Sequence, residues 1–374
     1  MKSKGFEIYI HIPFCARKCD YCDFVSFVCD KSVQHQYVDC MIEQLINKAE
    51  FAKDSIADSV FIGGGTPSVI APKEIDRIMN TIYKHYNVSD KPEITMEMNP
   101  NSITAEKLAI YKAGGINRVS MGLQSANDSE LKVLSRLHSY DEFLVAFERV
   151  REAGFANVNV DLMSAVPTQT VASYENSLRK VASLGPEHIS AYSLIIEENT
   201  PFFARYKDNT GLPTEEDDRQ MYHDTEKILS EFGMKRYEIS NYSLPGYECR
   251  HNVGYWTRKP YLGFGIAAAS LWDETRYKVH DDIKRYINKD FSEEKETLTD
   301  ADIISEYMFL GLRLVDGILV QDFWDKFKKS IDDIFPGVVA KLTKEGLMAA
   351  SNGRIFLTEK GLDIANYCMS EFIL

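Results

Sequence analysis

The sequence predicts an α/β protein, namely an incomplete (β/α)6 barrel of the TIM type followed by a mainly helical, winged-helix-like C-terminal extension. Three observations support this fold class. Short β-rich runs alternate with helical patterns over the first half of the chain, which is typical of βαβ units around a parallel sheet. Six such strands are too few for a closed barrel of eight. After about residue 298, helices are followed by a short hairpin, as in winged-helix modules.

The barrel elements follow in order along the first half of the chain. The six expected strands are Glu7–Ile12, Ser59–Ile62, Glu93–Met98, Arg118–Leu123, Asn157–Leu162 and His188–Leu194. The expected helices are Gln34–Ala49, Pro72–His85, Ala105–Ala113, Asp128–Leu134, Tyr140–Ala153 and Val171–Leu184. Parallel α/β folds place their chemistry at the carboxyl ends of the strands, so we expect the functional residues there.

Three regions are expected. Residues 1–210 form the barrel core, and residues 211–295 extend it. This extension contains a helix over Glu215–Phe232, a strand around Arg236–Ile239 and a loop rich in Tyr, Asn and Gly. Residues 296–374 form the C-terminal region. It contains helices over Ile303–Leu314, Val320–Phe327 and Val338–Ala349, a hairpin at Arg354–Thr358 and a last helix.

Composition narrows the class of protein. The 374 residues carry a net charge of −13, which argues against nucleic acid as the main partner, because phosphate contacts need a basic surface. No apolar run approaches the roughly 20 residues that span a bilayer, and the N-terminus does not resemble a signal peptide. We therefore expect a cytoplasmic protein. Seven cysteines in such a chain favour metal binding over disulfides.

Three of these cysteines are close together in the sequence. Cys15, Cys19 and Cys22 form a C-x3-C-x2-C motif, and thiolates bind iron–sulfur clusters or zinc. Three ligands leave the fourth iron of a [4Fe–4S] cluster open. An open iron can chelate S-adenosylmethionine (SAM), and an electron passed through the cluster then cleaves SAM to a 5′-deoxyadenosyl radical. The alternative is a zinc site with Cys29 or His11 as the fourth ligand.

The stretch from Tyr9 to Phe24 resembles radical SAM proteins related to oxygen-independent coproporphyrinogen III oxidase, and the resemblance extends over about residues 6–315. A glycine-rich run, GGGTPS at residues 63–68, follows the second expected strand. Glycines allow close approach of a ligand to backbone N–H groups. The resemblance implies that Gly64, Gly65 and Thr66 contact the methionine amino group of SAM.

The same resemblance implies further SAM contacts. Arg136 and Gln124 are expected at the carboxylate end of SAM, where an arginine fork suits a carboxylate. Glu97 and Asp161 are expected at the sugar and other polar parts. Tyr9 and Tyr21 are also expected at the SAM site, although Tyr9 alternatively fills the base of the barrel.

A second motif distinguishes two branches of the family. The oxidase branch carries a fourth cysteine two places after the third, where this chain has Phe24. The HemW-like heme chaperone branch carries C-x3-C-x2-C-D-F and, far downstream, H-N-x-x-Y-W. This chain has both, the second at residues 251–256. The resemblance implies that His251 is an axial heme ligand, with Cys249 as a competing thiolate ligand.

Neighbouring residues suit a porphyrin. Tyr255 and Trp256 offer flat apolar faces, and Arg250 or Arg258 would meet propionates.

The resemblance therefore predicts a heme chaperone that binds a [4Fe–4S] cluster, SAM and heme. Its expected partners are heme, an acceptor hemoprotein such as a membrane respiratory enzyme, an electron donor such as flavodoxin or ferredoxin, and a second copy of the chain in a homodimer, with no nucleic acid. One alternative is an oxygen-independent coproporphyrinogen III oxidase or another porphyrin-modifying radical SAM enzyme. Another is a regulatory binding module that acts through the winged-helix-like tail.

Overall fold

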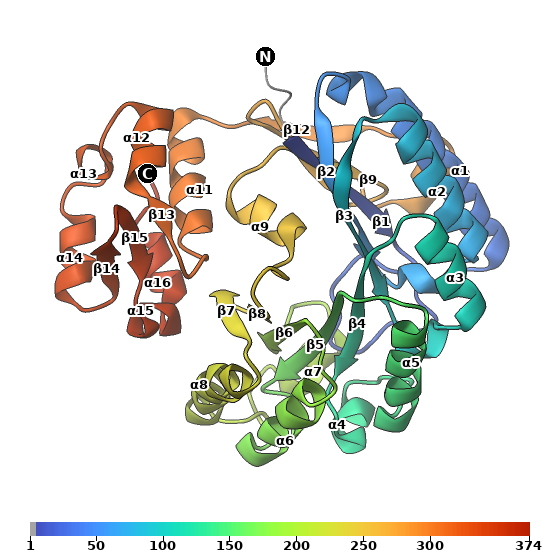
Figure 1. Cartoon of the computed structure of the whole chain (residues 1–374), viewed down its shortest axis with the longest axis horizontal. Helices are drawn as coiled ribbons and strands as arrows, with labels where there is room; N and C mark the ends of the chain where they lie inside the picture. Colours follow the sequence, from blue (N-terminus) through green and yellow to red (C-terminus); the bar gives the residue numbers. More distant parts are fainter. Residues whose placement is uncertain (1–4) are drawn as a thin grey trace.

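A six-stranded parallel sheet forms the centre of the computed structural model, which describes residues 5–374. The prediction that the N-terminus is not a signal peptide falls partly on residues 1–4, which lie outside this range. The strands pair in sequence order and confirm the expected incomplete barrel (Figure 1). They are β1 (Gly5–Ile12), β2 (Ile56–Gly64), β3 (Val88–Met98), β4 (Arg118–Gln124), β5 (Val158–Ser164) and β6 (His188–Ser193).

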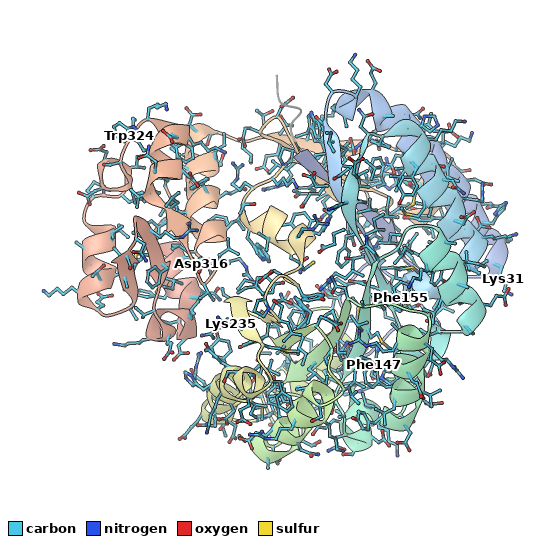
Figure 2. The ribbon with its side chains drawn as sticks, in the orientation of Figure 1. Lys31, Phe147, Phe155, Lys235, Asp316 and Trp324 are labelled. Carbon is cyan, nitrogen blue, oxygen red and sulfur yellow. The ribbon has the colours of Figure 1, made fainter. Side chains whose placement is uncertain are left out.

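Helices cover the outer, convex face of this sheet (Figure 1). They are α1 (Lys31–Lys48), α2 (Pro72–His85), α3 (Ala105–Ala113), α4 (Asp128–Val133), α5 (Tyr140–Glu152) and α6 (Val171–Ala182), with short 3-10 turns at Ala49–Ala52, Pro67–Val69 and Pro100–Ser102. Helix α5 shows why they form. A capping box between Ser139 and Glu142 starts it, and Phe143, Phe147 and Val150 recur at helical spacing on its buried face. Figure 2 labels Phe147 on this helix.

The sheet continues beyond the barrel at both edges. β9 (Tyr261–Phe264) pairs in parallel with β1, and β10 (Ala269–Trp272), β11 (Thr275–Val279) and β12 (Glu293–Thr297) follow in antiparallel order. At the other edge, β8 (Asn241–Ser243) and β7 (Lys235–Glu238) follow β6. The helices of this region are α7 (Pro201–Tyr206), α8 (Glu215–Glu231), α9 (Arg250–Trp256) and α10 (Ile283–Ile287). The prediction of a loop after residue 239 is therefore wrong, because this region holds the helices α9 and α10 and five short strands.

The C-terminal region forms a separate module with its own apolar core (Figure 1). Its elements are α11 (Asp300–Gly311), β13 (Ile318–Leu319), α12 (Val320–Phe327), α13 (Ile331–Ile334), α14 (Val338–Lys344), β14 (Met348–Ser351), β15 (Arg354–Leu357), α15 (Glu359–Asp363) and α16 (Ala365–Ser370). The three strands form one antiparallel sheet. The element order confirms the expected helices, and the pairing of β14 with β15 confirms the hairpin. The helix expected to reach Ala349 ends at Lys344, because Gly346 adopts a φ of +74° and turns the chain into β14.

The module contacts the barrel at β7. Val315 N–H donates to the Tyr237 carbonyl (3.0 Å), and Arg313 lies 3.3 Å from the Glu238 carboxylate. Figure 2 labels Lys235 and Asp316, which lie close to this contact in the sequence. Within residues 5–374, no helix combines the length and the apolar character needed to cross a bilayer.

Candidate functional site

The inner, concave face of the sheet is lined by polar side chains at alternate positions of the strands. On β3, Glu93, Thr95 and Glu97 are two residues apart, and the register aligns Glu97 with Ser120 of β4. The same register continues to later strands and aligns Ser120 with Asn159, Asn159 with His188, and Asp161 with Ser190. Alternation with a period of two places these residues on one face. The sequence carried this signal for all of them, but Glu97 and Asp161 were predicted instead from the family resemblance.

The three cysteines lie on a loop that leaves the carboxyl end of β1. Backbone hydrogen bonds close the loop, from Phe27 N to Pro13 O (2.7 Å) and from Cys15 N to Phe27 O (2.9 Å). Cys15, Cys19 and Cys22 are half-buried free thiols. Burial, together with the neighbouring Cys19 and Cys15, raises the pKa of Cys22 to about 11. The loop therefore brings the three sulfur atoms near one another.

The glycine-rich run packs directly against this loop. Gly65 N–H donates to Ile12 O (2.9 Å), and Thr66 N–H donates to Phe14 O (2.7 Å). Gly64 has a φ of +112°, which disfavours any side chain. A Cβ atom on Gly65 would lie 3.1 Å from the Cys15 sulfur. Glycine is thus required for this close approach.

Glu97, Asp161 and Arg136 complete the upper end of the barrel, which is the end toward the carboxyl termini of the strands. Glu97 accepts a hydrogen bond from Gly64 N–H (3.2 Å), and burial together with the neighbouring Asp161 raises the pKa of Glu97 to about 8. The pKa of Asp161 is also raised by burial, and hydrogen bonds from Asn159 and Ser190 oppose the rise. Asp161 lies within β5, which continues to Ser164, two residues beyond the expected strand end at Leu162.

Arg136 connects the cysteine loop to β4. Its Nη1 lies 3.7 Å from the Cys19 sulfur, and its Nη2 donates to the Gly122 carbonyl. Its Nε is buried and has no hydrogen-bond partner, which is unusual for a guanidinium. Gln124 ends β4 with a φ of +79°. The free Nε is a donor available to an anionic ligand.

The two tyrosines occupy different places. The Tyr9 hydroxyl lies in the lumen 3.0 Å from His11 Nδ1. His11 Nε2 lies 3.1 Å from the Val25 carbonyl, which can only accept, so Nδ1 accepts from Tyr9. Both nitrogens of His11 are therefore used within the protein, which disfavours it as a fourth zinc ligand. Tyr21 lies on the cysteine loop and packs edge-on against Phe202.

The donor set fits an iron–sulfur cluster with an open iron. It offers three free thiols on one loop and a buried arginine nitrogen that has no partner among residues 5–374. Over residues 5–374, no group of three or more His, Cys, Asp or Glu side chains is already arranged around a common metal position. The thiols are near one another without being closed around a centre.

Helix α9 carries the H-N-x-x-Y-W motif and lies beside the amino-terminal halves of the barrel strands (Figure 1). The Glu93 carboxylate of β3 accepts hydrogen bonds from Arg250 N–H and His251 N–H, both 3.1 Å long. The thiol of Cys249 lies 3.6 Å from the same carboxylate. Glu93 therefore holds the first turn of α9. We did not single out this residue from the sequence.

The side chain of His251 points into the protein and is only 1% exposed. Its Nδ1 lies 2.8 Å from Ser59 Oγ, and its Nε2 lies 3.0 Å from Tyr255 Oη. Burial, aided by Lys259 and Arg118, lowers its pKa to about 3. The imidazole is therefore neutral, which is the form that binds metals.

Cys249 is a weaker candidate for a ligand. Burial raises the pKa of Cys249 to about 12, and Arg118 only partly opposes this. It is therefore a thiol at physiological pH.

A cavity of about 410 Å³ lies between α9, β9, β10 and α11. Aromatic side chains and two arginines are prominent in its lining, which comprises Tyr9, Tyr255, Trp256, Arg258, Tyr261, Ala269, Leu271, Arg276, Glu306 and Leu310. Trp256 Nε1 and Arg258 Nη1 are buried without a partner. A larger hollow of about 950 Å³, lined by Asp54, Asp58 and Asp90, contains none of the predicted site residues.

Comparisons with known proteins identify two regions of the chain and its fold. Residues 9–181 match the radical SAM superfamily, and residues 298–364 match the HemN C-terminal domain. The fold is similar to coproporphyrinogen III oxidase HemN from Escherichia coli, with a TM-score of 0.87, 22% identity and coverage of 99% and 90% of the two chains. Fold and site together define a radical SAM protein, a class that binds a [4Fe–4S] cluster and SAM.

Full-length relatives identify the family. The chain is 35% identical to heme chaperone HemW of Bacillus subtilis (strain 168) over 98% of both chains. It is 33% identical to heme chaperone HemW of Lactococcus lactis (strain IL1403) over 100% of this chain and 99% of the relative. The chain belongs to the HemW family.

Proposed function

We propose that this protein binds heme and delivers it to hemoproteins, while its barrel holds a [4Fe–4S] cluster and SAM. The observation that carries the proposal is the likeness, over almost the whole chain, to relatives named heme chaperones. The structure adds two supporting features. One is the aromatic cavity beside α9, and the other is a neutral histidine that borders it through Tyr255.

Cys15, Cys19 and Cys22 would hold the cluster. When bound, the cluster supplies an electron and an open iron site to SAM. The free Nε of Arg136 would donate to the SAM carboxylate, and Gln124 lies at the end of β4, the strand whose Gly122 carbonyl accepts from Arg136.

The remaining polar groups of this end of the barrel would orient SAM. The backbone and hydroxyl groups of Gly64, Gly65 and Thr66 border the cysteine loop and would meet its amino group. Glu97 and Asp161 would accept hydrogen bonds from its polar and ribose groups. Tyr9 and Tyr21 would limit access of water to this end of the barrel.

Heme would bind in the 410 Å³ cavity with its face against Tyr255 and Trp256. Arg258 Nη1 is free to meet a propionate. His251 Nε2 is held by the Tyr255 hydroxyl, so coordination requires this hydroxyl to move aside. We prefer His251 to Cys249 as the ligand, because the imidazole is neutral whereas the thiol is protonated.

The oxidase alternative is less well supported. The likeness to HemN at 22% identity concerns the fold. Phe24, which is 65% exposed, stands where the oxidase branch carries its fourth cysteine. Anaerobic incubation with SAM, a reductant and coproporphyrinogen decides between the two, because formation of protoporphyrinogen would overturn the chaperone proposal.

The proposal includes partners and location. We propose that the protein acts in the cytoplasm, takes its electron from a flavodoxin or ferredoxin, and passes heme to an acceptor that includes membrane respiratory enzymes. We also propose a homodimer. Sedimentation of the reconstituted protein with and without heme tests the last point, since a monomer under both conditions would contradict it.

The central test is a heme titration of the anaerobically reconstituted protein, with iron, sulfide and SAM quantified in the same sample. Wild type is expected to develop a Soret band, and His251→Ala is expected to weaken and shift it. His223→Ala is the matched control, because His223 is an exposed histidine that pairs with Asp363 (3.2 Å). A Soret band unchanged in His251→Ala would contradict His251 as the ligand, and no band in wild type would contradict heme binding.

A further inference from the structure

A continuous chain of hydrogen bonds connects Asp161, in the upper barrel, with the first residue of the α9 region. Asn159 Nδ2 donates to Asp161 Oδ1 (2.7 Å), and Asn159 Oδ1 lies 2.6 Å from His188 Nδ1. His188 Nε2 lies 2.8 Å from Tyr237 Oη. The backbone N–H of Cys249, the residue that precedes α9, donates to Tyr237 Oη (3.2 Å). Four bonds thus link five residues.

Every hydrogen bond in this series is donated in the direction of Asp161. The Asn159 amide nitrogen faces the Asp161 carboxylate, so the amide oxygen faces His188 and must accept from Nδ1. His188 Nε2 then has a lone pair and accepts from the Tyr237 hydroxyl. That hydroxyl oxygen in turn accepts from Cys249 N–H. Burial lowers the pKa of His188 well below its usual value, which agrees with the neutral tautomer that this order requires.

The centre of this series, Asn159 and His188, is buried and lies outside both proposed ligand sites, whereas its first member, Asp161, belongs to the proposed SAM site. Asn159 is 2% exposed and His188 is fully buried. Neither His188 nor Tyr237 lines the aromatic cavity or belongs to the cysteine loop. The Tyr237 carbonyl also accepts from Val315 N–H (3.0 Å), so this residue touches the C-terminal module as well. Buried polar networks are fixed in geometry, because an unpaired member is costly.

We propose that His188 and Tyr237 are positioning residues that couple occupancy of the SAM pocket to the seating of helix α9. The inference rests on the proposed contact between Asp161 and SAM. Ligand hydroxyl groups that donate to the Asp161 carboxylate compete with Asn159 for its oxygens. The resulting shift of the Asn159 amide is passed through the imidazole and the phenol to Cys249 N–H, which precedes the helix that carries His251.

The test is hydrogen–deuterium exchange of the peptide that contains Cys249 and α9, in anaerobically reconstituted protein with and without SAM. Tyr237→Phe removes the one hydroxyl that joins the two halves of the chain and leaves both ends intact. Tyr174→Phe is the matched control, because Tyr174 is a buried tyrosine whose hydroxyl lies 3.0 Å from Thr225 Oγ1. SAM affinity is measured in parallel by equilibrium dialysis.

Wild type and Tyr174→Phe are expected to show exchange at Cys249 that changes about fivefold or more on addition of SAM. In Tyr237→Phe this dependence on SAM is lost, although SAM still binds. A purely structural role would change the exchange rate equally with and without SAM. His188→Gln, which breaks the chain at its centre, must give the same loss. SAM binding without any change at α9 in wild type would overturn the coupling and leave the SAM site standing, whereas no SAM binding would overturn both.

Discussion

The carboxyl group of Glu7 gives a sharp prediction about pH and stability. Glu7 is fully buried beside α9, and within residues 5–374 neither carboxyl oxygen has a hydrogen-bond partner. Lys259 Nζ, a cationic group, lies 3.8 Å from the carboxylate, and the neutral imidazole of His251 lies 3.9 Å away through Nδ1. Burial raises the pKa of Glu7 from 4.5 to about 8, and the charge of Lys259 only partly opposes this. The folded protein therefore keeps a proton on Glu7 at neutral pH.

The size of the pH effect on stability follows from the linkage between protonation of Glu7 and folding. A carboxyl group with a raised pKa in the folded state contributes stability that is complete below pH 4.5 and is lost as the pH rises through 8. Within this window the folded state binds one more proton than the unfolded state, so the free energy of unfolding falls by about 1.4 kcal/mol per pH unit. Glu7→Gln keeps the shape and removes the titration. Between pH 5.5 and 7.5, the variant should gain about 3 kcal/mol relative to wild type.

Urea unfolding of the apo protein between pH 5.5 and 7.5 measures this difference, with tryptophan fluorescence as the probe. Trp256 lies on α9, the helix whose Gly254 approaches Glu7, and reports on the barrel. Glu148→Gln, an exposed position on α5, controls for the exchange of a carboxylate for an amide. Parallel pH profiles for wild type and Glu7→Gln would refute the reasoning. A Glu7→Gln variant that is less stable at every pH would show instead that Glu7 is charged and paired with Lys259.

Four further predictions follow from the same geometry. A Cβ atom on Gly254 would lie 2.0 Å from Glu7 Oε1, so Gly254→Ala should cost about 1–3 kcal/mol in urea unfolding, and combining it with Glu7→Ala should restore part of the loss. Tyr255→Phe frees Nε2 of His251 and should tighten heme binding about 2- to 12-fold in a Soret titration. Unchanged affinity would contradict the proposal that the Tyr255 hydroxyl must move aside before heme binds. Cys19→Ala should abolish the brown chromophore, with iron and sulfide lost on analysis. Arg136→Lys should weaken SAM binding about tenfold in equilibrium dialysis, because lysine has no Nε donor.

Local sequence signals predicted the central sheet well. The strands from β1 to β6 and the helices between them carry periodic patterns and caps, such as the capping box of Ser139 and Glu142. Strands β8 to β12 were missed, because they are only three to five residues long and form by pairing with established strands. Tyr261, for example, owes its extended conformation to the ladder between β9 and β1. Such pairing is not visible in a local window.

The candidate site likewise has a part that local sequence signals predicted and a part that they did not. The spacing of Cys15, Cys19 and Cys22 indicates iron–sulfur chemistry, because sequence neighbours form a single loop. The chain through His188 and Tyr237 joins residues 49 positions apart, and only the sheet register brings them together. The motif at His251 suggested an open ligand, whereas the structure places the imidazole between two hydroxyl groups. Polar alternation along the strands was the available signal for these interior residues.

The pairing of β1 with β9 also bears on synthesis of the chain. During synthesis, β2 follows β1 closely and can pair with one edge of it. The other edge of β1 stays unpaired until β9 is made, about 250 residues later. At about 5–20 residues per second, that edge stays unpaired for roughly 12–50 s on the ribosome. An open strand edge invites aggregation. In the emerging chain, the segment from Tyr9 to Asp161 is translated well before α9, so the proposed cluster and SAM residues are present before the helix that carries His251 exists.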